Sequence, residues 1–374
     1  MRSPDESAAR QGRAIDIRPL LPYENSLVPQ LWNRAWSAGT ALHGHNPYPL
    51  NPALWRERLA SRHHDQSLLL GAFVESQLIA VAYAKLAVSP WQARDTGWLA
   101  LLCVEPPWQG KGIGTRLAAV TVRALQVRGC SHLRFGSEAD HFLPGLPQEA
   151  GTVAWRLTRR LGGVPSNTEH DLLLDLRTTL PSAPLPPGFR LRDDRAESGL
   201  AFVAQTFPGR WAEEVRDYIA GGATVITIER DGGDDVMNSA PAQGFCMVFQ
   251  GSERVTSPGL LWSDALVAEL GQASTRLAGI GPLGVSPDVR GAGAGLALVR
   301  GAAAWLQERG HTDAVINWTT LTSFYGRLGA RVWRSYQRVQ ANLAPLAGEA
   351  TSADDVHRDG EPSAPGQHAK ERTS

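Results

Sequence analysis

Two glycine-rich segments with almost the same pattern are the part of this chain best suited to chemistry. The segment Val104-Glu-Pro-Pro-Trp-Gln-Gly-Lys-Gly-Ile-Gly114 recurs as Val285-Ser-Pro-Asp-Val-Arg-Gly-Ala-Gly-Ala-Gly295. Each copy follows a short apolar run and begins an apolar stretch with helical periodicity. A glycine-rich turn between a strand and a helix presents several backbone N–H groups at the positive helix end, where a phosphate or pyrophosphate binds. The alternative is a helix start that binds no ligand.

The segments around the two turns also match, which indicates two copies of one fold. Each half begins with an alternating strand and then a helical pattern, and strand pairs follow. The paired segments are 15–18 and 189–192, 24–38 and 197–207, 67–86 and 223–250, 98–104 and 277–285, 112–128 and 293–309, 132–136 and 314–318, the helices that end in Leu161-Gly162 and Leu328-Gly329, and 171–176 and 336–343. This order predicts an α/β or α+β fold with helices on both faces of a sheet.

Three segments are too polar to contribute to a core. Residues 1–13 and 348–374 are rich in Ser, Asp, Glu, Gly and Pro, and we expect them to be disordered because they cannot bury enough apolar surface. The Pro-rich stretch 178–188 has the composition of an extended linker. It divides the chain into two expected domains, at 14–177 and 189–347.

The overall composition disfavours several classes of partner. The chain has 37 basic and 37 acidic side chains, so no net field favours nucleic acid or an anionic membrane. No apolar run approaches the ~20 residues that span a bilayer, and the first residues lack the apolar core of a signal peptide. Cys103, Cys130 and Cys246 have no metal or redox spacing. We therefore expect a cytoplasmic protein with reduced thiols and no metal.

The repeated pattern is Val-x-Pro-x-x-(Gln/Arg)-Gly-x-Gly-x-Gly between a strand and a helix, with a later Leu-Gly. It resembles the coenzyme A motif of the GNAT superfamily of N-acetyltransferases, over nearly the whole chain between its polar ends. The resemblance implies two tandem GNAT-like domains, each with a mixed, mostly antiparallel sheet whose central strands splay apart. In the family, acyl-pantetheine lies in that gap. Fourth-strand N–H groups hold the thioester carbonyl, the turn holds the pyrophosphate, and an amine attacks directly.

The resemblance assigns site residues most fully in the second half. Tyr325, in Ser323-Phe-Tyr-Gly-Arg-Leu-Gly329, matches the tyrosine that donates a proton to the departing thiolate. A phenol with a pKa of ~10 is protonated at neutral pH, as a general acid must be. The alternative is an ordinary core or surface tyrosine on a helix. The expected cofactor contacts in this half are Gly284, Val285, Arg290, Gly291, Ala292, Gly293, Ala294, Gly295, Asn317 and Phe324.

The first half keeps the turn but lacks the residues expected for catalysis. With the halves aligned on Leu-Gly, Thr158 takes the tyrosine position and Gly136 the asparagine position. Because threonine is a poor proton donor, we expect this half to bind cofactor without catalysis or to serve as a scaffold. A thiolate can also leave with help from water alone. The expected cofactor contacts here are Cys103, Val104, Gln109, Gly110, Lys111, Gly112, Ile113 and Gly114, with Lys111 adding a cation near the phosphates.

No general base is evident beside the second turn. The strand end Leu283-Gly-Val285 offers no carboxylate. Asp264 and Glu269 precede this strand and could reach it, although solvated surface positions are the alternative. An amine that is already partly neutral at the working pH needs no strong base.

Several other side chains have a second interpretation. His43 and His45 have metal-like composition without a supporting cluster, so contact with the acceptor is the alternative to a plain loop. His141 lies in an insertion of the first half with no derived role. Cys103 could act as an acyl-carrying nucleophile, but a buried inert thiol is favoured because no base lies nearby in sequence. We expect His311, in a turn, to be solvated.

The expected function is therefore acyl transfer from acetyl-CoA, the co-substrate, to a primary amine of a small molecule. One alternative is a non-catalytic acyl-CoA-binding sensor or interaction protein, which Thr158 and Gly136 favour for the first half. Another is acetylation of peptide N-termini or lysines, which an open groove between the halves would favour. The pattern leaves the acceptor, the acyl length and the oligomeric state open.

Overall fold

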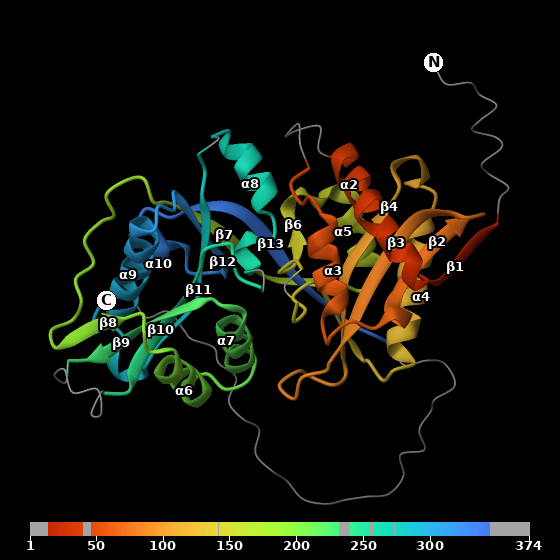
Figure 1. The fold of residues 1–374 in the computed structure, drawn as a ribbon. Coiled ribbons are helices and arrows are strands. Elements are labelled where there is room, and N and C mark those ends of the chain that lie inside the picture. The colour runs from red at the N-terminus through yellow and green to blue at the C-terminus, as the bar shows by residue number, and fades with distance from the viewer. Residues whose placement is uncertain are drawn as a thin grey trace, which may run out of the picture. The chain divides into compact units, whose positions relative to one another are not determined.

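The computed structural model describes residues 14–39, 46–140, 142–231, 240–254, 257–272 and 274–344. Within these ranges, strands and helices follow one another twice in closely similar order, as Figure 1 shows. The repeated unit confirms the predicted α/β class. The disorder expected for residues 1–13 and 348–374 concerns segments that lie outside the described residues.

The first half contains most elements where the sequence predicts them. One difference is the first helix, because Pro29 has no N–H and fits only the first turn of an α-helix. The α-helix therefore begins at Val28, and a 3₁₀ helix covers Pro22–Leu27. The elements are β1 (Ile15–Pro19), α2 (Val28–Gly39), α3 (Pro52–Ala60), β2 (Leu69–Val74), β3 (Gln77–Leu86), β4 (Thr96–Val104), α4 (Ile113–Gln126), β5 (His132–Phe135), β6 (Leu146–Pro147), α5 (Gly151–Arg160) and β7 (Val164–Asp175).

The second half repeats this order and adds a helix before its fourth strand. Its elements are β8 (Phe189–Arg192), α6 (Ala196–Thr206), α7 (Arg210–Gly221), β9 (Thr224–Arg230), β10 (Ala242–Phe249), α8 (Ser263–Leu270), β11 (Leu277–Val285), α9 (Ala294–Glu308), β12 (Asp313–Thr319), α10 (Thr322–Gly326) and β13 (Arg331–Asn342). The last strands of both halves, β7 and β13, begin several residues earlier than predicted.

The two halves exchange their last strands within one continuous sheet. The strand order is β1-β2-β3-β4-β5-β13-β7-β12-β11-β10-β9-β8. Strand β13 of the second half pairs with β5, and β7 of the first half pairs with β12. The two exchanged strands also pair antiparallel with each other over most of their length, which explains why both are longer than predicted. The division of the chain into two domains at residues 178–188 stays a prediction. Because β7 and β13 are exchanged, each half of the sheet also contains a strand from the other half of the chain.

Each face of the sheet carries a different set of helices, because strand side chains alternate between faces. In β10, Cys246 and Val248 pack in one core with α9, whereas Phe245 and Met247 pack in another with α6 and α7. The same alternation places α4, α5 and α10 on the side of α9, which we call the α9 face. Helices α2, α3 and α8 lie on the opposite side, the α7 face.

In each half, the pairing between the fourth and fifth strands stops before the fourth strand ends. Strands β11 and β12 pair in parallel only from Leu277 with Asp313 to Ile280 with Ile316, although β11 continues to Val285. Strands β4 and β5 likewise pair only up to Leu99 with Phe135. The edge of each fourth strand therefore loses its neighbour just before the glycine turn. This arrangement confirms the predicted splayed central strands.

Candidate functional site

The glycine turn of the second half is open at the surface. Gly291 and Gly293 have φ values of 79° and 87°, a region that favours glycine. Among the described residues, no heavy atom lies within 4 Å of a Cβ built at either position, so none of their side chains fills the turn. Gly293 is the N-cap of α9, and the N–H groups of the first helical turn have no acceptor within the helix. With the exposed Arg290 beside it, this turn can bind an anion.

The turn of the first half has nearly the same backbone. Gly110 and Gly112 have φ values of 75° and 77°, and a Cβ at either would have no heavy atom of the described ranges within 4 Å. Two side chains differ in their contacts. Gln109 Nε2 donates to the Val104 carbonyl oxygen at 2.9 Å, and Lys111 Nζ lies 5.1 Å from the centre of the Trp108 ring. Both turns therefore have the geometry of a phosphate site.

Tyr325 and Phe324 lie on the α9 face beside the second turn. Tyr325 is only 6% exposed, and its ring centre lies 4.9 Å from that of Phe324. A Cβ at Gly295 would lie 3.5 Å from the Phe324 ring, so these aromatics border the start of α9. Burial, and to a lesser extent the nearby Cys246, raise the pKa of Tyr325 above its ordinary value. The phenol therefore keeps its proton at neutral pH.

Asn317 stands where the two strands part. It follows Ile316, the last residue of β12 that pairs with β11, and it is half-buried. The next residue, Trp318, has a φ of 53°, and the register between β12 and β7 shifts before Thr319. The backbone N–H of Trp318 donates to Asp171 Oδ1 at 3.1 Å. The end of β12 is thus held by a carboxylate from the first half of the chain.

Aromatic side chains surround the same strand end on the α7 face. A Cβ at Gly284 of β11 would lie 2.5 Å from the Phe207 ring, so only glycine fits there. The Phe207, Trp211 and Phe245 rings form a cluster with centre distances between 5.1 and 6.0 Å.

Arg210, at the start of α7, connects this region to the first half. Its guanidinium lies 5.4 Å from the Trp318 ring centre and 5.9 Å from that of Trp91, which comes from the loop between β3 and β4. Arg210 Nε also bonds Glu214 Oε1 at 2.5 Å.

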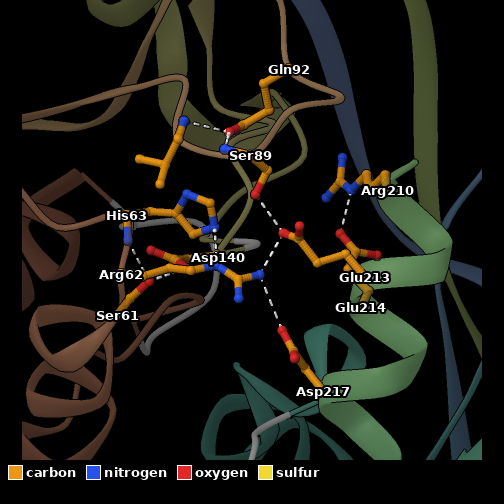
Figure 2. A network of polar contacts seen from close by, with 11 residues as sticks. Ser61, Arg62, His63, Ser89, Gln92, Asp140, Arg210, Glu213, Glu214 and Asp217 are labelled. Carbon is orange, nitrogen blue, oxygen red and sulfur yellow. Dashed lines mark hydrogen bonds and ion pairs between the residues drawn. The ribbon is translucent and has the colours of Figure 1, made fainter.

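An ion-pair network between the halves holds α7 in place, as Figure 2 shows. Glu213 of α7 accepts from Ser89 Oγ at 2.5 Å and pairs with Arg62. Arg62 also pairs with Asp217 at 3.2 Å. Ser89 and Arg62 belong to the first half, so that half forms direct polar contacts with α7. It also places Trp91 beside Arg210, near the end of β12.

The corresponding region of the first half is filled by its own side chains. Thr158 is 3% exposed, and its hydroxyl donates to the Ala154 carbonyl oxygen at 2.8 Å, within its own helix. In the insertion after β5, Phe142 and Leu143 are buried in the core formed with α2 and α3. Asp140 of the same insertion forms a buried ion pair with Lys85. Because the Thr158 hydroxyl already donates to Ala154, it is a poor proton donor at the tyrosine position.

We expect Phe142→Ala to lower the free energy of unfolding by about 3–5 kcal/mol, because a buried aromatic ring is lost. The ring of Phe142 lies 5.5 Å from that of Trp32 and 5.4 Å from that of Trp262. Urea unfolding followed by tryptophan fluorescence measures the change. As a control, Val153→Ala, at a position 62% exposed, should change stability by less than about 0.5 kcal/mol. Equal unfolding midpoints for both variants would contradict the packing of this insertion.

Other residues selected from the sequence lie elsewhere or play other roles. Cys103 is buried, and burial raises the pKa of its thiol, which disfavours a nucleophilic role. The expectation for His311 was wrong: its turn packs against the start of β11, so the residue is only 6% exposed.

Asp264 and His311 line a surface cleft of about 520 Å³ near Leu277, at the end of β11 away from the turn. His43, His45 and His141 lie outside the described residues.

Glu269, the second carboxylate considered as a base, is occupied by donors from β13. It accepts from Trp333 Nε1 at 2.6 Å and from Arg334 Nη2 at 2.8 Å. Within the described ranges there is no group of three His, Cys, Asp or Glu side chains that could hold a metal ion, and no helix long and apolar enough to cross a membrane.

Sequence reasoning missed three residues around the end of β12: Trp91, Asp171 and Arg210. Trp91 and Asp171 belong to the first half, and only the loop after β3 and the exchanged strand bring them to this place. Their spacing along the chain carries no signal of this proximity. Arg210 starts a helix whose sequence is that of an ordinary amphipathic surface helix.

Comparison with known proteins agrees with this geometry. Residues 28–142, in the first half, match the model of the acetyltransferase (GNAT) family. A mycothiol acetyltransferase of Salinispora arenicola (strain CNS-205) is 26% identical over 253 residues, which cover 64% of this chain and 71% of that protein.

Solved structures with both halves show the same fold. A GCN5-related glucosamine N-acetyltransferase region of a fungal multidomain β-N-acetylglucosaminidase has a TM-score of 0.71 at 21% identity, covering 88% of this chain but only 38% of that one. A GCN5-related N-acetyltransferase from Sphaerobacter thermophilus has a TM-score of 0.61 at 16% identity, with 88% and 95% covered. A tandem GNAT protein from the clavulanic acid biosynthesis pathway has a TM-score of 0.58 at 16% identity, with 89% and 99% covered.

Proposed function

This chain is an acyltransferase with two tandem GNAT-like halves, and from that premise we propose that its second half transfers an acetyl group from acetyl-CoA to a primary amine of a small molecule. One observation carries the proposal. In the second half, an open glycine turn, a parted strand edge and the protonated Tyr325 lie together. In the first half, the tyrosine position holds Thr158, whose hydroxyl is bonded within its own helix.

Acetyl-CoA supplies the thioester whose acetyl group is transferred, and the residues present fit it at two places. The N–H groups of the turn, with the exposed Arg290, suit its pyrophosphate. The edge of β11 beyond Ile280 has lost its strand neighbour, so its backbone groups can hold the thioester arm. Asn317 and Phe324 flank that edge, where β12 parts from β11 and where the α9 helix begins.

Tyr325 is the residue that completes the chemistry on the sulfur side. Its phenol can donate a proton to the departing sulfur as the bond between nitrogen and the acetyl carbon forms. The attack is direct, because Cys103 and Cys246 are buried thiols whose pKa values are raised by burial and so offer no thiolate for an acyl-enzyme. The first half acts as a scaffold that also shapes the acceptor side through Trp91.

The proposal is tested by release of free coenzyme A in the presence of a panel of amines. The panel includes glucosamine, because one structural relative is named a glucosamine N-acetyltransferase. It also includes peptides with a free N-terminus or lysine. Release with a small amine supports the proposal, and release with peptides alone would favour a peptide acetyltransferase. Tight binding of acetyl-CoA without any release would favour a sensor.

We also propose that the protein acts in the cytoplasm. Cys103, Cys130 and Cys246 are all buried and free, which suits a reducing compartment.

A further inference from the structure

The proposed reaction needs a group that accepts the proton of the amine, and the exchanged strand β7 carries a carboxylate to the end of β12, where the strands part. Leu172 and Leu174 of β7 pack in the core of the α9 face, and Leu173 packs with α8 on the opposite face. Because side chains alternate along a strand, Asp171 points to the α7 face. Tyr325 lies on the α9 face. An acid and a carboxylate therefore stand on opposite faces of the sheet, at the place where β11 and β12 part.

The contacts of Asp171 place its carboxylate at this strand end. Its Oδ1 accepts from the backbone N–H of Trp318 at 3.1 Å, and its Oδ2 accepts from the Tyr336 hydroxyl at 2.8 Å. Trp318 follows Asn317, the first residue of β12 beyond the pairing with β11. Two donors use two of the roughly four lone-pair sites of a carboxylate, so Asp171 can still accept a further proton. Its side chain is 3% exposed, so burial disfavours its charged form.

Burial gives Asp171 more basic character than an ordinary aspartate. Burial raises its pKa to about 6, against the lowering effects of the Tyr336 and Trp318 hydrogen bonds and of the Arg334 charge. The carboxylate is therefore largely ionised at neutral pH and can accept a proton there. The charged and titratable groups around it come from several elements: Glu169 on β7, Arg334 and Tyr336 on β13, Glu269 of α8 bonded to Arg334, Tyr48 near Tyr336, and Glu149 bonded to Tyr48.

We propose that Asp171, a residue of the first half, accepts the proton of the acceptor amine in the reaction of the second half. This inference rests on the proposed function. The nitrogen–carbon bond forms and the carbon–sulfur bond breaks, while the nitrogen proton passes to an Asp171 oxygen. The sulfur receives the Tyr325 proton, and solvent returns a proton from Asp171 to Tyr325. The first half is then necessary for the chemistry and not only for the fold.

The competing explanation is that Asp171 only fixes the end of β12 and the Tyr336 hydroxyl. The test compares kcat/KM against pH for the wild type and the isosteric Asp171→Asn variant, with the amine of highest turnover in the panel. We expect kcat to fall about 100-fold or more and the acid limb with its midpoint near pH 6 to disappear. The Kd for acetyl-CoA should stay within about twofold, because Asp171 lies on the other face.

Two further variants separate catalysis from structure. Tyr336→Phe removes a hydrogen bond that lowers the pKa of Asp171, so the acid limb should move to higher pH. Asp171→Glu should restore part of the rate together with an acid limb. Asp264→Asn, also on the α7 face but at the far end of β11, serves as the control and should leave the profile unchanged.

The outcomes are distinguishable. An Asp171→Asn enzyme that melts at a lower temperature but keeps the acid limb would overturn the assignment while leaving the proposed function intact. A wild-type enzyme that acetylates no member of the panel would refute the proposed function, and this assignment with it.

Discussion

Replacing Tyr325 with phenylalanine should lower kcat by about 100-fold or more, the range expected when a general acid is lost. The phenyl ring keeps the buried position and the contact with Phe324, so the fold should be preserved. Acetyl-CoA binding should also hold, because the substitution leaves the glycine turn and the unpaired edge of β11 unchanged. Steady-state kinetics and calorimetric titration measure the two quantities separately.

The pH dependence gives a second readout for the same variant. An acid must be protonated to act, so activity should fall as the pH rises through its pKa. Burial raises the pKa of Tyr325, which places this descending limb above the ordinary range of a tyrosine. Tyr325→Phe should lose the limb. The matched control is Thr158→Val in the first half, which removes a hydroxyl bonded within its own helix and should leave turnover unchanged. An equally large loss of rate in Thr158→Val would contradict the assignment of the general acid to the second half.

Local patterns predicted most of the fold. The repeated glycines determine where a strand must turn into a helix, and both turns adopt the left-handed φ values that glycine allows. Helical periodicity predicted α4, α6 and α9, and alternation predicted the first strands β1 and β8, whereas α3, α7 and α8 were not predicted. These signals act over a few residues, so one sequence is enough to read them.

The exchange of β7 and β13 could not be predicted in the same way. The run Leu172-Leu173-Leu174 is buried on both faces, which fits the centre of either half's sheet. Because the two halves repeat one fold, each last strand could pair with the fifth strand of its own half or with the equivalent fifth strand of the other half. The choice between them depends on long-range pairing, which local periodicity does not encode.

The dependence of sequence prediction on local patterns also explains which residues around the parted strands could be selected and which were missed. Arg290, Asn317 and Tyr325 were selected through the family resemblance, Arg290 in the glycine turn and the other two in and before the segment that ends in Leu328-Gly329. Their grouping as a site stays a prediction. Asp171 appeared as the first residue of a strand, and Trp91 as part of a loop. Their positions beside the end of β12 depend on the strand exchange and on the ion pairs of α7 with the first half, neither of which has a local signature.

Replacing Gly291 with valine should weaken acetyl-CoA binding by about 100-fold. A valine side chain in the open turn would cover the N–H groups that we propose to bind the pyrophosphate. Losing two hydrogen bonds to a charged group, at about 1.5 kcal/mol each, corresponds to roughly two orders of magnitude in Kd. Calorimetric titration of acetyl-CoA measures this directly, and KM for acetyl-CoA should rise in parallel.

The matched control is Gly110→Val, because the two glycines have φ values of 75° and 79° and neither would place a Cβ within 4 Å of another atom. Both substitutions therefore carry a similar backbone strain, of order 1–3 kcal/mol, and should lower the melting temperature to a similar extent. Only the Gly291 variant should lose acetyl transfer, whereas kcat/KM for acetyl-CoA in the Gly110 variant should stay within about twofold. If the Gly110 variant instead lost transfer while the Gly291 variant kept it, the catalytic turn would be that of the first half, which is the half that the family model matches.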